Sequence, residues 1–470
     1  MARSRNGHSE IRWLNLGLII DQFRGTIRET PVSRPTEVGQ VRGELQQYDF
    51  LRPVPLDDLT ADVARLLRIY SLHVTHPRYF GLFNPGVREA GIVAETLAAA
   101  FNPQLAAWSH SPIANEIEEH VLRQFSALLG FPATTAANFT TGGAEANLSA
   151  VVVALGHQFP VWSNEGLAAL KTKPRIYLSA DAHDSLVKAV RVCGLGDSAI
   201  RRVPTTPPSF ALDSTQLEKL IEDDRRNGWC PFMIVGTAGT TSTGAIDSLE
   251  LLASIAQKYG AWFHVDAAWG GTAVLSPNLR QEVSGIELAD SITWDAHKWL
   301  SVPFSAGMFF CRHAASVRSA FSVNASYMPA HSAGTTDPYA TTIQWTRRAI
   351  GLKVFMCLAE LGLDGYRRVI EHQAAMGALL RQRLEEEGFQ VVNQTALPLI
   401  CFTHPAIREN KRNTRDLLEG LYSRGQVWIS DVLPSGHTER FLRACITHYE
   451  TNEGDIDCLL RELANSISDG

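Results

Sequence analysis

Five short apolar runs, separated by helical or turn-rich sequence, constrain the fold more than any other feature of this chain. Each is five to eight residues long, the length of a buried strand, and they cover residues 175–179, 232–237, 261–268, 291–295 and 307–311. Largely apolar runs of this length are typical of parallel strands covered by helices on both faces, and each of the five fits such a strand. The pattern therefore predicts an α/β fold with a largely parallel sheet.

The sequence on either side of this region has a different character. Residues 1–65 mix short apolar pieces with prolines and carry too few apolar side chains to fold alone, so we expect a helical arm that packs on a larger unit. Near the other end, long helices are expected at 347–361 and 366–387. Short strands are expected to follow at residues 389–392, 397–403, 427–430 and 441–448. We therefore predict an N-terminal arm (1–65), a large domain (66–345) and a small α+β domain (346–470).

Charge and cysteine content limit the partners and the compartment. The formal net charge of −6 does not suit a protein whose main partner is nucleic acid or an anionic membrane. Seven cysteines are dispersed without CxxC spacing, which indicates reduced thiols and neither a disulfide framework nor a metal site. No stretch approaches the roughly 20 apolar residues that span a bilayer, and residues 13–20 are not followed by a signal-peptide cleavage site. We expect a cytoplasmic protein.

A glycine pair within residues 138–147 precedes an Ala-rich helix that is expected to start at Gly143. At such a turn, free backbone N–H groups and the positive end of the helix dipole can hold a phosphate. A tight turn without any ligand has the same sequence. This motif alone therefore leaves both interpretations open.

An aspartate, Asp266, occupies an otherwise apolar predicted strand. Burying a free carboxylate is costly, so Asp266 needs a partner. The protonated ring nitrogen of pyridoxal phosphate (PLP) is one such partner, and a cap on the next turn is another. A metal site with His264 is a third, although no further ligand stands at a suggestive spacing. Ala268 points to the same face of the strand and is small enough to lie under a flat ring.

A lysine, Lys298, directly follows the next predicted strand, in the sequence DAHKW at 295–299. The adjoining Trp and Leu make this a poor place for a solvated charge, and partial burial of a lysine favours Schiff-base chemistry. The order along the chain joins these motifs, because a Gly-rich turn, a His-bearing segment at 181–185, Asp266 and Lys298 follow one another. We interpret this order as a PLP site to which Lys298 attaches the cofactor.

With these motifs the sequence resembles the group II PLP-dependent decarboxylases, which include the aromatic amino acid, glutamate, histidine and cysteine sulfinate decarboxylases. The resemblance extends over about residues 76–463. Its most specific segments are HPRYFG at 76–81, SP at 111–112, NEIE at 115–118, TGGAEANL at 141–148, DAHDS at 181–185, HVDAA at 264–268 and DAHKW at 295–299. It implies PLP fold type I, similar to aspartate aminotransferase, and a homodimer with shared active sites whose N-terminal arms wrap the partner.

The resemblance also implies a role for each residue of the site. Lys298 would form the Schiff base with PLP, and Asp266 would pair with the ring nitrogen. Ala268 and His183 would pack on opposite faces of the ring, and His183 would also reach the substrate carboxylate or a transferred proton. The remaining cofactor contacts would come from Gly143, Ala144, Thr237, Asp295 and His297.

The reaction that the resemblance implies is removal of the α-carboxylate from an L-amino acid. Residues 322–341 resemble a mobile loop whose tyrosine protonates Cα, and Tyr327 matches that tyrosine through the pattern Tyr-apolar-x-x-His. Members that form aldehydes have phenylalanine there, so Tyr327 favours release of an amine. Transamination, aldehyde synthesis and decarboxylative carbon–carbon bond formation are alternatives on the same fold. A non-enzymatic PLP-fold protein is a further class, which the intact Lys298 and Asp266 disfavour.

The expected substrate pocket departs from that of the aromatic decarboxylases. Residues 82–85 (LFNP) replace an aromatic-Pro-Thr run, and Gln104 stands where those relatives place an apolar residue. Asn84 and Gln104 are therefore candidate substrate contacts in a more open and polar pocket. Arg443 falls on a C-terminal strand where some members bind a carboxylate. Arg347, at the start of the helix between the domains, either contacts substrate or pairs within the protein.

Overall fold

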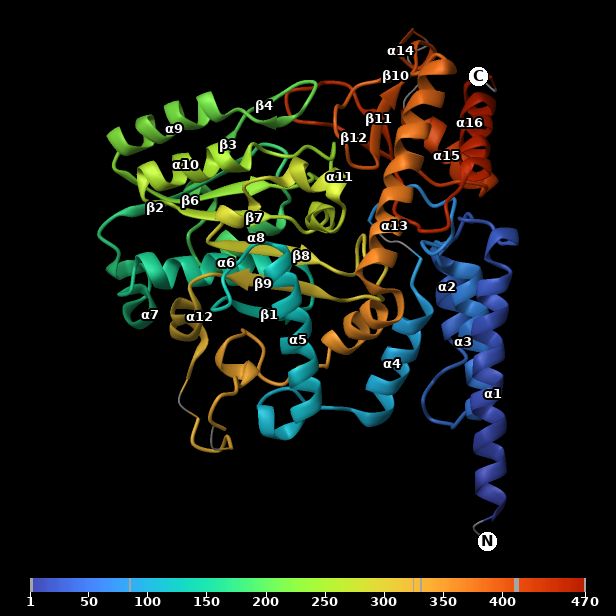
Figure 1. Cartoon of the computed structure of the whole chain (residues 1–470). Coiled ribbons are helices and arrows are strands. Elements are labelled where there is room, and N and C mark those ends of the chain that lie inside the picture. Colours follow the sequence, from blue (N-terminus) through green and yellow to red (C-terminus); the bar gives the residue numbers. More distant parts are fainter. Residues whose placement is uncertain (1–2, 84–85, 324, 330–331, 410–413, 469–470) are drawn as a thin grey trace.

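A seven-stranded sheet lies at the centre of the computed structural model, which describes residues 3–83, 86–323, 325–329, 332–409 and 414–468 (Figure 1). The strand order is β1-β9-β8-β7-β6-β2-β3. The strands are β1 (Ala136–Thr140), β2 (Lys173–Ser179), β3 (Ile200–Val203), β6 (Trp229–Thr237), β7 (Trp262–Asp266), β8 (Ser291–Asp295) and β9 (Gly307–Cys311). The central strands β7, β8 and β9 are buried along their whole length, as their continuous apolar sequence predicts.

The sheet is mostly parallel, with one exception to the sequence prediction. The order β3-β2-β6-β7-β8 is parallel throughout. The run 307–311, which also fits a parallel strand, instead forms β9 and pairs antiparallel with both β8 and β1. A parallel return requires a long crossover, usually a helix, whereas only the loop 296–306 joins β8 to β9. This short loop carries Lys298.

Helices cover both faces of the sheet and produce two separate cores. One core contains side chains of α6 (Gly143–Gln158), α8 (Ser185–Val192) and α12 (Ala314–Phe321). The other contains side chains of α5 (Pro112–Leu128), α9 (Ser214–Arg226), α10 (Leu249–Tyr259) and the start of α13 (Gly351–Glu386). Alternation along β6 places Ile234 in the second core and its neighbours Met233 and Val235 in the first. The result is the expected three-layer α/β arrangement.

A smaller antiparallel sheet follows in the C-terminal part, in the order β10-β11-β13-β12. Its strands are β10 (Gln390–Val391), β11 (Leu399–Thr403), β12 (Ser430–Val432) and β13 (Phe441–Cys445). It shares a core with the end of α13 and with α15 (Thr414–Arg424) and α16 (Glu453–Ser468). The two helices predicted at 347–361 and 366–387 form the one element α13, interrupted at Gly362, where φ is 67°. Short elements elsewhere are the hairpin β4 (Thr205–Thr206) and β5 (Ala211–Leu212), and α7 (Trp162–Glu165), α11 (Pro277–Arg280) and α14 (Pro405–Glu409).

The strand predicted at 427–430 is only partly correct, because β12 begins at Ser430. Trp428 instead forms a parallel bridge with Tyr79, and Phe80 N–H donates to the Trp428 carbonyl at 2.8 Å. The apolar character of this stretch is real, since Val427 and Ile429 are buried in the core of the small sheet. The segment near residue 80 therefore adds to the small sheet, where the Cys445 N–H also donates to the Phe80 carbonyl at 2.9 Å.

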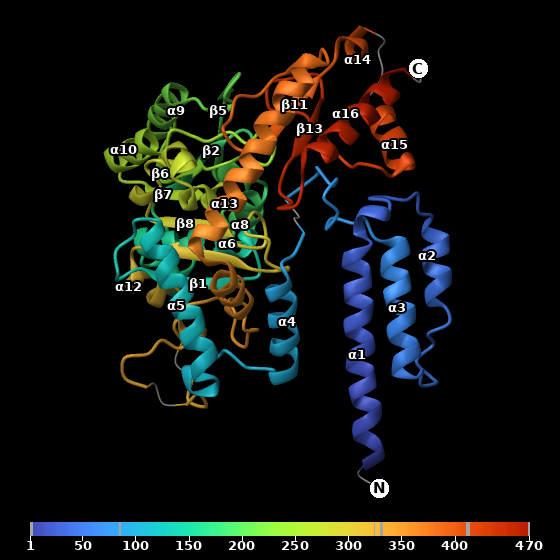
Figure 2. The ribbon, with the colours of Figure 1, turned by 45° about the vertical axis from the view of Figure 1, so that its right-hand side comes forward.

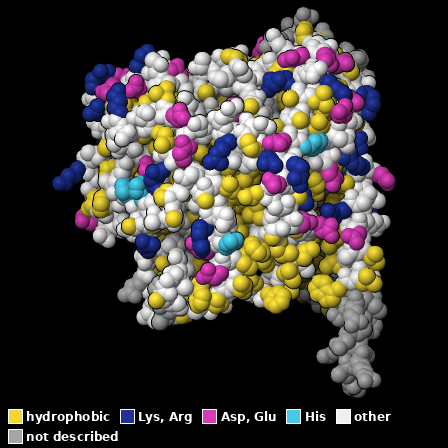
Figure 3. Space-filling model, in the orientation of Figure 1, with side chains coloured by type: hydrophobic (Ala, Val, Ile, Leu, Met, Phe, Trp, Pro, Cys, Tyr) yellow, Lys and Arg dark blue, Asp and Glu magenta, His cyan; other side chains and the backbone are white. Residues whose placement is uncertain are grey.

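The N-terminal helices α1 (Arg3–Gly25), α2 (Val38–Leu45) and α3 (Leu56–Tyr70) stand side by side, apart from the main body (Figure 2). Trp13 and Leu14 on α1 are 60% and 65% exposed, and Leu67 on α3 is 61% exposed. Figure 3 shows hydrophobic side chains gathered over this region and over α4 (Glu89–Phe101). No helix within the described ranges has the length and apolar character to cross a membrane. The domain limits at 65 and 345 stay predictions.

Candidate active site

A cavity of about 370 Å³ lies at the ends of β6, β7 and β8, where they meet the start of α6. This is the edge of a parallel sheet at which α/β proteins bind ligands. All nine residues that the sequence places at a cofactor line the cavity, namely Gly143, Ala144, His183, Thr237, Asp266, Ala268, Asp295, His297 and Lys298. They come from five separate stretches of the chain, so the fold brings together residues that are far apart in the sequence.

Lys298 is held at the cavity by an ion pair. Its Nζ lies 3.2 Å from Asp295 Oδ2, and its side chain is 20% exposed. Asp295 is buried, and its Oδ1 has no hydrogen-bond partner among the described residues. The amine is thus fixed where it reaches a molecule in the cavity. An amine that passes its proton to a neighbouring base can attack a carbonyl carbon.

Asp266 and Thr237 are paired residues at the ends of the parallel strands β7 and β6. The buried Asp266 carboxylate accepts hydrogen bonds from Asn147 Nδ2 at 2.9 Å and from the Ala268 N–H at 3.1 Å. Both donors are neutral, so the carboxylate can still take a cationic partner. Thr237 Oγ1 is buried and has no hydrogen-bond partner in the described part of the chain. Two polar groups at this edge are therefore available to a ligand.

The turn before α6 requires glycine at Gly143 for lack of space. A Cβ at this position would lie 2.8 Å from Asp295 Oδ2 and 3.4 Å from the Ala268 Cβ. The preceding Gly142 has a φ of 149°, which L side chains rarely adopt. The first N–H groups of a helix have no partner inside it. Those of Gly143 and Ala144 can therefore hold an anion at the positive end of α6.

His183 is oriented by the start of α8. The Ser185 N–H donates to His183 Nδ1 at 3.2 Å, and Ser185 Oγ lies 2.9 Å from the same nitrogen. A ring nitrogen that accepts from a backbone N–H carries no proton, so the hydrogen of the neutral imidazole is on Nε2. His183 therefore has an N–H donor on the edge of the ring away from Ser185.

His297 has the same tautomer for a similar reason. The Ala306 N–H donates to His297 Nδ1 at 3.1 Å, while Nε2 lies 3.8 Å from Asp295 Oδ2. Burial lowers the pKa of His297 and favours the neutral ring. A neutral His297 with its proton on Nε2 can donate to an anion beside the start of α6.

Arg443, on β13, and Lys298 lie around one aromatic ring. The Phe83 ring centre is 5.7 Å from Lys298 Nζ and 5.1 Å from Arg443 Cζ. Arg443 is 2% exposed and donates to the carbonyls of Thr241 and Gly81, each at 2.8 Å. Its Nη2 is buried without a hydrogen-bond partner among the described residues. A buried guanidinium N–H left in this way can bind a carboxylate.

Tyr327 and Gln104 are not brought to this cavity by their own chain. Tyr327 is 75% exposed and stacks on Trp345, with ring centres 5.9 Å apart. Gln104 is exposed beyond the end of α4, and neither residue lines the cavity. Asn84 lies outside the described residues. The roles predicted for all three stay predictions.

Arg347 pairs within the protein. Its Nη2 lies 2.6 Å from Glu118 Oε2, and both side chains are 3% exposed. Glu118 also accepts the Gly351 N–H at 2.9 Å, at the start of α13. Of the two interpretations open for Arg347, structural pairing is therefore the one observed.

Sequence reasoning did not single out Asn147, Ser185 or Trp269, which also line the cavity. Asn147 lies four residues after Gly143 in α6, so helical spacing places both on one face. That spacing was a usable signal. Trp269 stacks on Phe83 with ring centres 4.4 Å apart, and its Nε1 is buried without a partner among the described residues. Its place depends on packing between distant segments, which no local pattern shows.

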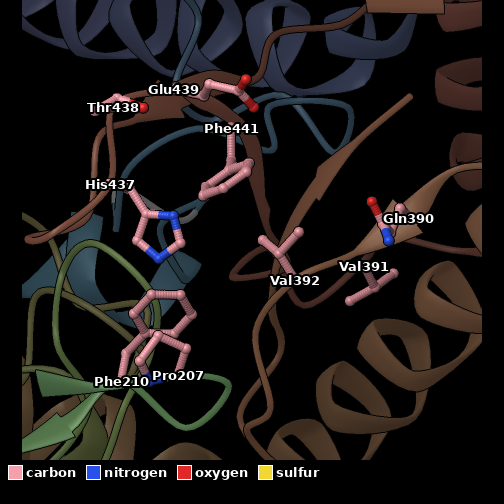
Figure 4. Close-up of a pocket in the computed structure, with 9 residues that line it drawn as sticks. All are labelled: Pro207, Phe210, Gln390, Val391, Val392, His437, Thr438, Glu439 and Phe441. Atoms are coloured by element: carbon pink, nitrogen blue, oxygen red, sulfur yellow. The ribbon is translucent and has the colours of Figure 1, made fainter. Parts of the chain in front are cut away.

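A second cavity, of about 320 Å³, lies between the β4–β5 hairpin and the small sheet (Figure 4). There the ring of His437 lies 5.4 Å from that of Phe210 and 5.2 Å from that of Phe441. As far as the described residues extend, its lining includes no lysine and no helix start. The chemistry expected from the sequence therefore belongs to the first cavity.

Comparison with known proteins agrees with this assignment. The conserved domain of pyridoxal-dependent decarboxylases matches residues 44–404. A phenylacetaldehyde synthase from Petunia hybrida is 28% identical over 454 residues, which cover 92% of this chain and 88% of the relative. An acidic amino acid decarboxylase from Bos taurus is 28% identical over 413 residues, covering 84% and 78%. The crystal structure of mouse CSAD, 25% identical, superposes with a TM-score of 0.91 over 98% of each chain.

Proposed function

This chain belongs to the family of pyridoxal-dependent decarboxylases, and on that premise we propose that it removes the α-carboxylate of an L-amino acid and releases CO₂ and an amine. Its fold is PLP fold type I and its cofactor is PLP, as the sequence predicted. The observation that carries the proposal is the meeting of Lys298, Asp266 and His183 in one cavity.

The residues of the cavity fit PLP. Three buried polar atoms there, Thr237 Oγ1, Trp269 Nε1 and Asp295 Oδ1, have no hydrogen-bond partner among the described residues. Unpartnered buried groups are costly, and a polar ligand removes that cost. Gly143 keeps the helix start open where a Cβ would close on Asp295. These features match a cofactor with a phosphate and a polar ring.

Each group of residues has its own task in this proposal. Lys298 would hold the cofactor through a covalent bond from its amine. Asp266 keeps a proton on the ring nitrogen, because a buried carboxylate favours a cation beside it. The N–H groups of Gly143 and Ala144, with His297 Nε2–H, hold the phosphate. His183 covers the ring and turns its Nε2–H toward the substrate carboxylate.

When bound, PLP supplies an electron-accepting ring that takes up the electron pair of the bond broken at Cα. The protein then decides what happens at that carbon. Tyr327 donates a proton to Cα after CO₂ has left, so that the amine is the product. Closure of the loop that carries Tyr327 excludes water while this happens.

Arg443 binds a carboxylate of the substrate in this proposal. Arg443 does not itself line the cavity, but its guanidinium, with the buried and unpartnered Nη2, lies 5.1 Å from the Phe83 ring centre, and Lys298 Nζ lies 5.7 Å from the same centre. A charge-assisted hydrogen bond from this remaining guanidinium nitrogen favours a carboxylate. The acidic amino acids, on which the Bos taurus relative is named to act, are therefore one substrate class to test first.

The working unit in this proposal is a homodimer with shared active sites. Tyr327 lies away from the cavity of its own chain, which a contribution from the second chain would explain. Exposed apolar side chains on two N-terminal helices, among them Trp13, Leu14 and Leu67, offer a surface for such a partner. A second copy would bury them and bring its loop to the first chain's cavity.

The test is a product screen. Purified protein saturated with PLP is incubated with each common L-amino acid, and mass spectrometry identifies the products while released CO₂ is measured separately. We expect CO₂ and amine in equal amounts from one class of amino acid. CO₂ accompanied by aldehyde would replace the proposal with aldehyde synthesis. Bound PLP without CO₂ release from any amino acid would refute decarboxylation.

A further inference from the structure

Asn147 has every hydrogen-bonding position of its side chain filled by buried neighbours, two of which, Asp266 and Ser185, line the cavity. It is 1% exposed, one helical turn after Gly143 in α6. Its Nδ2 donates to Asp266 Oδ2 and to Ser185 Oγ, each at 2.9 Å. Its Oδ1 accepts from His264 Nε2 at 3.0 Å and from Thr293 Oγ1 at 2.7 Å. An amide has two donors and two acceptor positions, so none is left over.

The Asp266 carboxylate fixes which way the amide points. If oxygen and nitrogen were exchanged, the Asn147 oxygen would face the oxygen of Asp266, and two acceptors would meet in a buried site. In the observed orientation the NH₂ group faces Asp266, and the oxygen faces the two donors, His264 and Thr293. The orientation of the amide is therefore determined by chemistry.

The hydrogen bonds continue on the far side of Asn147, through His264. Trp262 Nε1–H can only donate, and it donates to Ser291 Oγ at 2.9 Å. His264 Nδ1 lies 2.9 Å from Ser291 Oγ and 3.1 Å from the Ser291 carbonyl oxygen. Burial lowers the pKa of His264 to about 4, and its Nε2 lies 3.0 Å from Asn147 Oδ1. A chain of hydrogen bonds thus runs from Trp262 to Asp266.

A second branch runs from Asn147 to His183. Because Ser185 Oγ accepts from Asn147, the Ser185 hydroxyl directs its own hydrogen to His183 Nδ1 at 2.9 Å. This is the nitrogen that also accepts the Ser185 N–H. The hydroxyl therefore supports the tautomer of His183 that has its proton on Nε2.

We propose that Asn147 is a positioning residue that joins both branches, orienting the Asp266 carboxylate toward the ring nitrogen of PLP and supporting the Nε2–H tautomer of His183. Asn147 acts through its neighbours and needs no contact with substrate. Its amide is well suited to this place, because it alone supplies two donors on one side and two acceptor positions on the other without a charge. Thr293, whose hydroxyl helps to hold the amide oxygen, is part of the same device.

The decisive variant is Asn147→Asp, which keeps the shape but puts a carboxylate oxygen against Asp266. Loss of a hydrogen bond to a charged group, together with this repulsion, weakens PLP binding by about 10- to 100-fold. It also changes the protonation of the bound ring, so the visible absorbance spectrum of bound PLP differs from that of the wild type. Both readouts are measured without substrate, by titrating the PLP-free protein with PLP.

Asn393→Asp is the matched control. Asn393 is also buried, donates to the carbonyls of Thr243 and Leu399 at 2.8 and 3.0 Å, and accepts the Cys401 N–H at 2.8 Å. The same exchange there removes donors from backbone oxygens and leaves Asp266 untouched. We expect this variant to melt at a lower temperature while retaining the PLP affinity and the spectrum of the wild type.

Thr293→Val keeps the test decisive if Asn147→Asp fails to fold. Valine has the shape of threonine and removes only the hydroxyl that holds Asn147 Oδ1, so PLP affinity falls by about 2- to 10-fold. The proposal is wrong if both variants bind PLP with wild-type affinity and spectrum, or if Asn393→Asp alters them equally. These readouts do not involve product, so they stand whichever reaction the product screen finds.

Discussion

Gly143→Ala tests the site through one added methyl group. The new Cβ would lie 2.8 Å from Asp295 Oδ2, closer than an ordinary contact, and 3.4 Å from Ala268 Cβ. Relief requires either Asp295 or the start of α6 to move. Asp295 is held by Lys298 Nζ at 3.2 Å, so its movement would displace the amine that carries the cofactor. Movement of α6 would displace the N–H groups that face the phosphate.

The size of the effect follows from the cost of overpacking, which is about 1–3 kcal/mol in a well-packed site. If that cost falls on the bound state, PLP affinity decreases by about 5- to 150-fold, since about 1.4 kcal/mol corresponds to a factor of ten. The backbone at Gly143 is not in the left-handed region, so the effect arises from contact and not from strain.

The assay is a PLP titration of the PLP-free protein, followed by absorbance, with thermal melting recorded in parallel. Gly156→Ala is the matched control, because Gly156 is in the same helix and its Cβ would meet nothing closer than Ser163 Oγ at 3.5 Å. That change should stabilise α6 by about 0.5–1 kcal/mol and leave PLP affinity unchanged. If Gly143→Ala binds PLP as tightly as Gly156→Ala, the crowding at Asp295 is not what keeps this position glycine.

Three further variants test single residues. Lys298→Ala should abolish both the visible absorbance of covalently held PLP and the release of CO₂, and a covalent absorbance that persists would assign the attachment to another lysine. Lys298→Ala and Tyr327→Phe chains should each be nearly unable to form amine alone. If the loop serves the partner's site, mixing the two chains should restore about a quarter of the wild-type activity, because half of the dimers are mixed and each mixed dimer contains one intact site. No recovery on mixing would place Tyr327 in its own chain's site. Arg443→Lys keeps a charge but loses the planar fork, so KM should rise by about 10-fold or more while PLP affinity is retained; an unchanged KM would leave Arg443 a purely structural residue.

Much of the fold could be predicted because its information is local. The predicted strands at 291–295 and 307–311 match β8 and β9 residue for residue. The direction of β9 could not be predicted in the same way, since direction depends on how the chain returns across 296–306 and not on the strand itself. At 427–429 the side chains are buried as expected, but the backbone pairs with the segment near Tyr79, which is distant in sequence.

The predicted cofactor residues and the predicted substrate residues differ in how the fold positions them. Each predicted cofactor residue lies within three residues of a strand end or a helix start, and parallel strands bring such ends to one edge of the sheet, so these residues meet in one cavity. Tyr327 and Gln104 belong to exposed segments that no strand aligns with that edge. Asn147 lies between these cases. Its helical spacing from Gly143 indicates a shared face, but only the three-dimensional contacts with Asp266 and His264 show that its amide completes the polar network of the site.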